Sequence, residues 1–350
     1  MKRIGVLTSG GDAPGMNAAI RAVVRTAIAN DMSVVGFKRG YNGVLMLNNG
    51  TNEDYEIMTR RSVGETIHRG GTFLMTARCL DFHEPEMQKK AIANMRLLGL
   101  EGLVVIGGDG TFRGASAMTE LGFPVVGVPG TIDNDLPYTD FTLGFDTAVN
   151  TACECINKIR ETSDSHERGS LVTVMGRHCG DIALNTAIAS GAEIVLLPER
   201  PWSIEELAGR IKWSVMEGKR SIIIVMAEGA MDSLTSDLPA LIKAHPELGV
   251  TGEGSLSSSK LAALLETLSG HEIRATVLGY IQRGGTPSAS DRILGSRLGE
   301  RAVELLRDDI GGMAVGIRDN KIIEVPFAQA FGSHRPVNEQ LMALLDTLST

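Results

Sequence analysis

The segment Val104–Asp135 reads VVIGGDGTFRGASAMTELGFPVVGVPGTIDND and holds two short apolar runs, each followed by a polar loop. The first run, 103–106, is continuous and β-branched, as expected for a strand buried on both faces. It ends in Gly-Gly-Asp-Gly-Thr at 107–111, and the pattern then predicts a helix to about 121 and a strand over 124–128. In such a βαβ unit both loops lie at the carboxyl ends of neighbouring parallel strands, where open α/β sheets bind ligands.

The glycine-rich loop 107–111 predicts a phosphate-binding site. Its three glycines let the backbone approach an oxyanion closely, and the following helix presents free N–H groups and a partial positive charge. Asp109 within this loop suits a Mg²⁺ ion that the phosphates carry.

The loop 129–135 predicts acid–base chemistry, because it presents Asp133 and Asp135 after Thr131. Residues two apart in an extended segment point the same way, so the two carboxylates are expected to share a site. One would act as general base on a hydroxyl while the other orients that hydroxyl or the metal. Asp-Asn-Asp by itself is typical of turns, and its place beside a phosphate loop favours the catalytic interpretation.

Composition restricts the class of protein. The 350 residues suffice for two domains, 43% of them are hydrophobic, and the formal net charge of −8 argues against non-specific nucleic-acid binding. No signal peptide, lipidation motif or apolar run of membrane-spanning length is recognisable. The four cysteines form no CxxC or zinc-binding spacing. These features predict a cytoplasmic protein that binds neither nucleic acid nor membrane.

Other glycine-containing loops also follow expected strands, at 9–17, 175–181, 227–229 and 279–285. The loop 9–17 is a second anion site by the same physics, although it is no Walker A loop. In the second half of the chain, arginines stand at loop tips or strand starts, namely Arg168, Arg177, Arg274 and Arg283. They suit a substrate phosphate or another anion, and the alternative is ordinary surface salt bridging. The Ser-, Gly- and Thr-rich segment 230–258 predicts an exposed insertion with one short helix.

The chain is therefore expected to be an α/β protein with two Rossmann-like parallel-sheet domains and an active site in the cleft between them. The expected domains are 1–144 with about 282–330, and 145–281 with a C-terminal helix in 331–350. A nucleotide donor in the first and a phosphorylated acceptor in the second would give phosphoryl transfer by positioning, with Asp133 as base.

The segments LTSGGDAPGMNAAIR, GGTFLMTAR, VVIGGDGT, PGTIDND, MGRHCGD and ATVLGYIQRGG together resemble the bacterial ATP-dependent 6-phosphofructokinases. The resemblance covers residues 1 to about 325. It implies transfer of the γ-phosphoryl group of Mg-ATP to the 1-hydroxyl of fructose 6-phosphate, a step of glycolysis that gives fructose 1,6-bisphosphate and ADP. It also implies Mg²⁺ as cofactor, ATP bound by the first domain, the sugar phosphate bound by the second, a nucleotide effector and a homotetramer.

The resemblance also assigns residues. For ATP it implies Gly11, Arg78, Cys79, Gly108, Asp109, Gly110 and Thr111, with Asp109 as the Mg²⁺ ligand. For catalysis it implies Asp133 as base, supported by Gly11, Arg78, Thr131, Asp135 and Arg177. For fructose 6-phosphate it implies Thr131, Ile132, Asp133, Arg168, Met175, Gly176, Arg177, Glu228, Arg274, Tyr280, Ile281, Gln282 and Arg283, with Arg168 and Arg274 reaching the sugar of a neighbouring subunit. For the allosteric effector it implies Arg21, Arg25, Arg60, Arg160, Gly191, Glu193 and Lys219.

Two alternatives stay open. Pyrophosphate-dependent relatives carry Asp where Gly110 stands and Lys where Gly130 stands, so the two glycines favour ATP as donor. A non-catalytic nucleotide sensor would not need the intact carboxylates Asp109, Asp133 and Asp135. An NAD-dependent dehydrogenase is disfavoured, because the loop after the first strand lacks the GxGxxG pattern.

Overall fold

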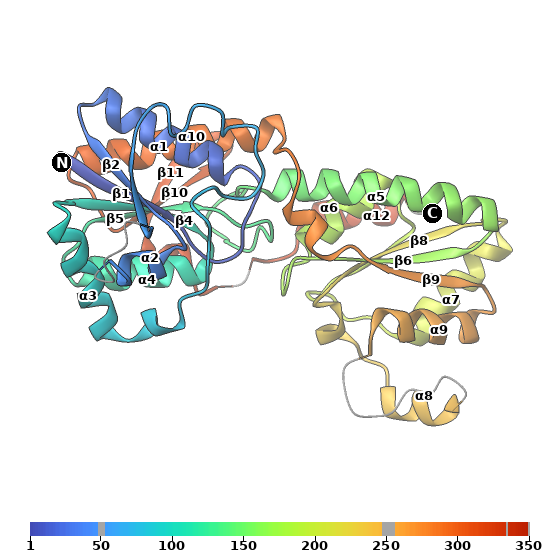
Figure 1. Ribbon diagram of the computed structural model, residues 1–350. Coiled ribbons are helices and arrows are strands. Elements are labelled where there is room, and N and C mark those ends of the chain that lie inside the picture. The colour runs from blue at the N-terminus through green and yellow to red at the C-terminus, as the bar shows by residue number, and fades with distance from the viewer. Residues whose placement is uncertain (48–52, 247–255, 334, 349–350) are drawn as a thin grey trace. The chain divides into compact units, whose positions relative to one another are not determined.

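The structure is a computed structural model that describes residues 1–47, 53–246, 256–333 and 335–348. The chain divides into two compact units, which are residues 1–147 with 283–335 (unit 1) and 148–282 with 336–350 (unit 2). The expected α/β class with two parallel-sheet domains is confirmed, since each unit has its own sheet with helices against it (Figure 1). This division does not test the expectation that unit 1 binds the nucleotide and unit 2 binds the sugar phosphate. That expectation stays a proposal.

Unit 1 is built on a sheet in the order β11-β10-β5-β4-β1-β2-β3, with antiparallel strands only at its two edges. Its strands are β1 (Arg3–Thr8), β2 (Ser33–Phe37), β3 (Tyr55–Met58), β4 (Gly102–Gly107), β5 (Val125–Pro129), β10 (Met313–Arg318) and β11 (Lys321–Pro326). From the centre the chain proceeds outward in opposite directions, from β1 to β2 and from β4 to β5. The topological switch point therefore lies between β1 and β4, where an open α/β sheet binds its ligand.

Helices cover both faces of this sheet (Figure 1). One face carries α1 (Met16–Ala29) and α10 (Ala289–Arg307), and the other carries α2 (Tyr41–Leu45), α3 (Pro85–Leu97) and α4 (Asp109–Glu120). The short segments η1 (Leu80–His83) and α11 (Phe327–Ala330) complete the unit. Because both faces are covered, every residue of β4 is buried, as its continuous apolar run predicted.

Unit 2 holds a smaller, fully parallel sheet in the order β7-β8-β6-β9. Its strands are β6 (Gly169–Val174), β7 (Ile194–Leu196), β8 (Ile222–Ala227) and β9 (Ile273–Val277). Helices α5 (Phe145–His166), α6 (Asp181–Ser190) and α12 (Glu339–Leu348) lie against one face, and α7 (Ile204–Met216) and α9 (Ser258–Ser269) against the other (Figure 1). The segments η2 (Ala230–Ser233), α8 (Leu238–Ala244) and η4 (Gly279–Arg283) lie in connections.

The boundaries of some elements differ from the sequence-based expectation. Helix α4 begins at Asp109 rather than near 112, because the helix starts inside the glycine-rich loop. Strands β10 and β11 form an antiparallel hairpin around Asp319-Asn320, and it extends the first sheet beyond β5. The short helix expected in the insertion 230–258 is α8, while residues 247–255 of that insertion lie outside the described residues. Among the helices of the described part of the chain, none has the length and apolarity that a bilayer crossing requires.

Candidate active site

The loops after β1 and β4 meet at the switch point of the first sheet. The backbone N–H of Ser9 donates to the carbonyl of Ile106 at 3.0 Å, and the Thr111 hydroxyl donates to the Ser9 carbonyl at 3.1 Å. A Cβ on Gly107 would lie 2.3 Å from Thr111 Oγ1 and 2.5 Å from the Ser9 carbonyl oxygen. Only glycine allows this close approach, so residue 107 fixes how the two loops join.

The N-terminus of α4 has the features of the predicted phosphate cradle. Its N-cap, Gly108, is extended and provides no side-chain cap, and its carbonyl accepts the N–H groups of Thr111 and Phe112, so the N–H groups of Asp109 and Gly110 are left without a partner in the helix. A Cβ on Gly110 would meet no atom within 4 Å, which leaves open space directly beside these N–H groups. Free donors and the positive end of the helix dipole together suit an anion.

Asp109, the predicted Mg²⁺ ligand, is the first residue of α4 and is half-buried. Its carboxylate pairs with Arg113 at 2.7 Å and accepts the Gly332 N–H at 3.2 Å. Within the described ranges no group of three or more His, Cys, Asp or Glu side chains gathers to hold a metal. A lone accessible carboxylate fits a Mg²⁺ that arrives on nucleotide phosphates and keeps most of its ligands from them and from water.

The loop after β5 lies directly beside the loop after β4, as the βαβ pattern predicted. The N–H of Gly130 donates to the Gly107 carbonyl at 2.9 Å. Thr131 Oγ1 accepts the N–H of Asp133 at 3.2 Å, and the Thr142 hydroxyl donates to the Thr131 carbonyl at 2.6 Å. These bonds hold Asp133, whose exposed fraction is only 2%, in a fixed backbone position next to the cradle.

The expectation that Asp133 and Asp135 point the same way from an extended segment is wrong. Asn134, between them, has φ 51°, so the segment bends at this point and is not extended. The Asn134 side chain stabilises this conformation by accepting the Thr142 N–H at 3.0 Å and donating to the Asp140 carbonyl at 3.2 Å. Ile132 belongs to the core, with no exposed surface. Direct roles for Asp133 and Asp135 stay predictions.

The segment that carries Arg78 and Cys79 is linked to the start of α4 through Tyr41, which the sequence analysis did not assign. The Tyr41 hydroxyl donates to the Thr111 carbonyl at 2.7 Å, and its ring stacks on Phe82 with centroids 4.0 Å apart. Burial raises the pKa of the Cys79 thiol, so it stays protonated. The Arg78 side chain is exposed and can turn toward an anion at the cradle.

Arg283 belongs to unit 1 and lies against the loop after β1. Its guanidinium donates to the Asp12 carbonyl at 3.1 Å. A Cβ on Gly11 would lie 2.5 Å from Arg283 Nη1, so glycine at position 11 makes this contact possible. The structure thus brings the predicted substrate residue Arg283 together with the predicted ATP residue Gly11.

In unit 2, the loops after β6 and β8 are joined around Arg177. The Arg177 N–H donates to Glu228 Oε1 at 2.8 Å, and a Cβ on Gly229 would lie 2.1 Å from the Arg177 carbonyl oxygen. Gly176 at φ 130° and Arg177 at φ 51° form a sharp turn in which a Cβ on Gly176 would be 2.4 Å from the Cys179 carbonyl oxygen. Four predicted substrate residues therefore lie together, namely Met175, Gly176, Arg177 and Glu228.

The segment after β9 contributes to the same end of this sheet. Gln282 is fully buried and accepts the Met175 N–H at 3.2 Å, so it is a structural link. Tyr280 and Ile281, in contrast, are exposed at 83% and 53%. Their side chains are accessible to a ligand, as their predicted role in substrate binding requires.

Arg168 and Arg274 lie at the opposite end of the strands from this cluster. Arg168 precedes β6 and Arg274 is near the start of β9, and both pair with Glu272, at 3.6 and 2.8 Å. Met175 follows the last residue of β6, and a strand of that length spans about 20 Å. Within one chain, the structure does not bring these two arginines together with Arg177.

The predicted effector residues are distributed over both units. In unit 1, burial and then the neighbouring charge of Arg25 lower the pKa of Arg21, while Arg60 is exposed after β3. In unit 2, the guanidinium of Arg160 donates to the carbonyls of Ser190 and Gly191, at 2.7 and 3.1 Å. Lys219 Nζ lies 3.6 Å from Glu193 Oε1, and of these two residues Glu193 closely follows Gly191 in the chain.

Two doubly wound units, one with an uncapped helix at its switch point beside a buried aspartate, define a phosphate-binding α/β protein of the phosphotransferase type. The sequence profile of the Phosphofructokinase family matches residues 3–306. The chain belongs to the phosphofructokinase family.

Relatives of known name agree with this assignment. The chain is 49% identical over 349 residues to proteins named ATP-dependent 6-phosphofructokinase from Bacillus thuringiensis and Bacillus cereus, with 100% of both sequences covered. Its structure is similar to that of phosphofructokinase from Saccharomyces cerevisiae, with a TM-score of 0.81 and 32% identity, and it spans 47% of that longer chain. A pyrophosphate-dependent phosphofructokinase from Marinobacter aquaeolei shares the fold, with a TM-score of 0.80 and 21% identity over 97% of this chain and 86% of that one.

Proposed function

We propose that this chain is an ATP-dependent 6-phosphofructokinase, which transfers the γ-phosphoryl group of ATP to the 1-hydroxyl of fructose 6-phosphate. The observation that carries the proposal is the hydrogen bond between Gly130 and Gly107, which joins the loop of a buried aspartate to an open phosphate cradle. The names of the full-length bacterial relatives support the same reaction.

Unit 1 supplies the donor site in this proposal. The N–H groups at the start of α4 bind the phosphates, and the loop of Gly11 with the cationic side chains of Arg78 and Arg283 adds donors and positive charge. Asp109 would hold the Mg²⁺ that accompanies ATP, and this ion would supply positive charge to the phosphate oxygens. To bind Mg²⁺, the Asp109 carboxylate would have to give up part of its ion pair with Arg113.

Unit 2 supplies the acceptor site. Glu228 and Gly229 hold the backbone of Arg177, and the accessible Tyr280 lies after β9. An exposed guanidinium on a fixed backbone suits the bidentate recognition of a sugar phosphate. Arg168 and Arg274, at the other end of the strands, would serve a neighbouring subunit in a homotetramer.

Asp133 is the general base in the proposed mechanism. Its carboxylate takes the proton of the sugar 1-hydroxyl as the oxygen attacks the γ-phosphorus and ADP leaves. Thr131 holds the Asp133 backbone, and Arg78 and Arg177 stabilise the charge on the transferring phosphoryl group. Because phosphoryl transfer needs little covalent chemistry from the protein, the fixed position of these groups provides most of the catalysis.

The two diagnostic glycines support ATP as the donor for different physical reasons. Gly110 faces open space, so an Asp side chain would fit there and would repel the nucleotide phosphates. Gly130 faces packed atoms instead, because its Cβ would lie 2.9 Å from Ile106 Cγ2 and 3.0 Å from Met16 Cε. A lysine at residue 130 would therefore require the loop to repack. It could not simply occupy the space of a missing phosphate group.

A coupled assay of fructose 1,6-bisphosphate formation tests the proposal, with Mg-ATP and Mg-pyrophosphate compared at equal concentrations. We expect product with ATP and at most a trace with pyrophosphate. Comparable rates with pyrophosphate would show that the two glycines do not determine the donor. A folded chain that binds ATP and forms no product with either donor would instead be a nucleotide sensor.

A nucleotide effector site is a second candidate function of the same chain. Burial and then the nearby charge of Arg25 lower the pKa of Arg21, and within the described residues neither arginine forms an ion pair. Adjacent cations without a carboxylate favour a polyanionic ligand. An ADP titration of Arg21→Ala and Arg25→Ala, with sugar-phosphate affinity as readout, tests this role, and unchanged responses would exclude it.

A further inference from the structure

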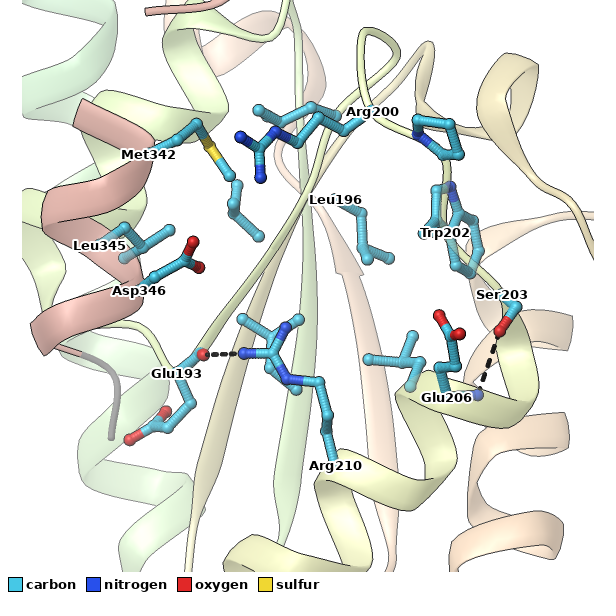
Figure 2. A pocket seen from close by; sticks show the side chains of 15 residues that line it. Glu193, Leu196, Arg200, Trp202, Ser203, Glu206, Arg210, Met342, Leu345 and Asp346 are labelled. Atoms are coloured by element: carbon cyan, nitrogen blue, oxygen red, sulfur yellow. Dashed lines mark hydrogen bonds between the residues drawn. The ribbon is translucent and has the colours of Figure 1, made fainter. Parts of the chain in front are cut away.

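Unit 2 contains a cavity that the proposed reaction does not use. It has a volume of about 170 Å³ and lies between the edge strand β7, the first turns of α7 and the C-terminal helix α12 (Figure 2). About half of its wall is apolar, and the side chains that form this part include Leu196, Trp202, Leu207, Met342 and Leu345. All five are buried within the unit, so the cavity has a preformed shape.

Charged groups of both signs surround these apolar walls. Arg200 and Arg210 provide positive charge, and Glu206 and Asp346 provide negative charge (Figure 2). They come from three different segments, which are the loop before α7, α7 itself and α12. The cavity therefore presents separated charges around an apolar surface.

The four charged groups do not neutralise one another. Glu206 and Arg210 have the i, i+4 spacing and order that favour an ion pair on a helix, yet in the described part of the chain they form none. Arg210 Nη2 instead donates to the Glu193 carbonyl at 3.3 Å. Arg200 pairs with Glu339 at 2.6 Å, outside the lining of the cavity. Donors and carboxylates thus stay available to a ligand.

We propose that this cavity binds a free α-amino acid with an apolar side chain. The carboxylate of the ligand would bind the guanidinium of Arg210, its ammonium group would bind Asp346, and its side chain would contact Leu196, Trp202 and Met342. The volume is appropriate, since a protein cavity of about 150 Å³ holds a benzene molecule.

A nucleotide or a simple phosphate fits this cavity less well. The N-terminus of α7 is already capped, because Ser203 Oγ accepts the Glu206 N–H at 3.2 Å, and two carboxylates would repel a dianion. Of the effector residues named above, only Glu193 lines this cavity. The Glu193 carboxylate binds the Ile223 N–H at 2.8 Å and Lys219, so only the backbone of Glu193 faces the cavity.

The indole of Trp202 provides a direct readout of binding. The chain has two tryptophans, and the other, Trp213, is 54% exposed on α7, so Trp213→Phe leaves Trp202 as the single emitter. We expect a saturable change of Trp202 fluorescence when L-leucine, L-methionine or L-phenylalanine is added to this variant. Two analogues of leucine serve as matched probes, 4-methylpentanoate without the ammonium group and 3-methylbutylamine without the carboxylate, and we expect both to bind at least about tenfold more weakly.

Single substitutions in the same background identify the site. Arg210→Gln and Asp346→Asn should each weaken L-leucine binding by at least about tenfold, whereas Lys212→Gln, on an exposed position of α7, should not. The thermal unfolding temperature of each variant is the control. If it is unchanged, weaker binding is not due to loss of structure. The proposal is overturned if none of the three amino acids gives a saturable change, or if 4-methylpentanoate binds as well as leucine and Asp346→Asn has no effect. Because fluorescence reports binding alone, these outcomes do not depend on the kinase activity.

Discussion

Gly107 and Gly110 stand three residues apart in the phosphate loop and serve different purposes. Gly107 permits a backbone approach that any Cβ would block, while Gly110 leaves space where the nucleotide phosphates are expected. From the sequence both are simply members of a glycine-rich loop. The distinction depends on the neighbouring loop after β1, which no local pattern reveals.

Alanine substitutions should separate these two roles. Gly107→Ala should destabilise the protein by about 2 kcal/mol or more, because its Cβ would overlap Thr111 and the Ser9 carbonyl oxygen. Gly110→Ala is the matched control and should be neutral or slightly stabilising, since alanine favours the helix and meets no atom. Urea unfolding of both variants measures the difference, and equal stabilities would contradict the described packing.

A negative charge at residue 110 should weaken ATP binding without changing the stability of the fold. Gly110→Asp should raise KM for ATP by at least about tenfold through repulsion of the phosphates, while Gly110→Asn, which is neutral and nearly isosteric, should have a much smaller effect. Steady-state kinetics at fixed Mg²⁺ distinguishes the variants. If Asp and Asn change KM equally, the phosphates do not lie beside residue 110.

At the scale of elements, sequence patterns predicted the βαβ unit and the arrangement of its loops. The continuous apolar run of β4 and the Gly-Gly-Asp-Gly-Thr loop were sufficient, since a buried parallel strand and a helix start depend on local sequence. The bend at Asn134 was missed because it depends on Thr142, eight residues later. The separation of Arg168 from Arg177 at opposite ends of β6 is compatible with the expectation that Arg168 serves a neighbouring subunit.

The beginnings of α5 and α10 are joined by one buried carboxylate. Asp291 is 1% exposed and accepts the N–H groups of Gly144 and Thr147, at 2.8 and 2.9 Å, and the Thr147 hydroxyl. Asp291→Ala leaves these donors buried without an acceptor and should cost about 2–4 kcal/mol of unfolding free energy. Chemical denaturation measures the loss, and a cost below about 1 kcal/mol would mean that this link is not structural.

The Asp291 carboxylate should also make the stability of the fold depend on pH. Burial raises the pKa of Asp291 in the folded protein, despite the opposing effect of its hydrogen bonds. Protonation therefore favours the folded state, so the contribution of Asp291 to stability is fully present below the unfolded pKa of about 4 and is lost as pH rises through the folded pKa. Relative to Asp291→Asn, the unmodified chain should lose stability as pH rises from about 4. A constant difference between the two across this range would contradict the raised pKa.

At the scale of the whole molecule, each unit provides a different part of the proposed chemistry. Unit 1 carries the uncapped helix and the buried aspartate, and unit 2 carries the oriented arginine. The position of Arg168 and Arg274 at the opposite end of the β6 and β9 strands supports the proposal that they serve a second subunit.

We therefore expect a homotetramer in solution. Sedimentation velocity should give a species of four chains, each of 37.3 kDa. Substituting Arg274→Ala should raise KM for fructose 6-phosphate while the KM for ATP stays unchanged. A fully active monomer would contradict the role of these two arginines across subunits.

Asp133 is the base of the proposed phosphoryl transfer, and the turnover of the Asp133→Asn variant measures this role. The substitution preserves the shape of the side chain and removes its basicity, so kcat with Mg-ATP and fructose 6-phosphate should fall by about 10²–10⁴ while ATP binding is retained. Asp319→Asn, at an exposed aspartate of the same unit, is the control and should keep full activity. An Asp133→Asn protein with undiminished kcat would contradict the assignment of the base and with it the proposed mechanism.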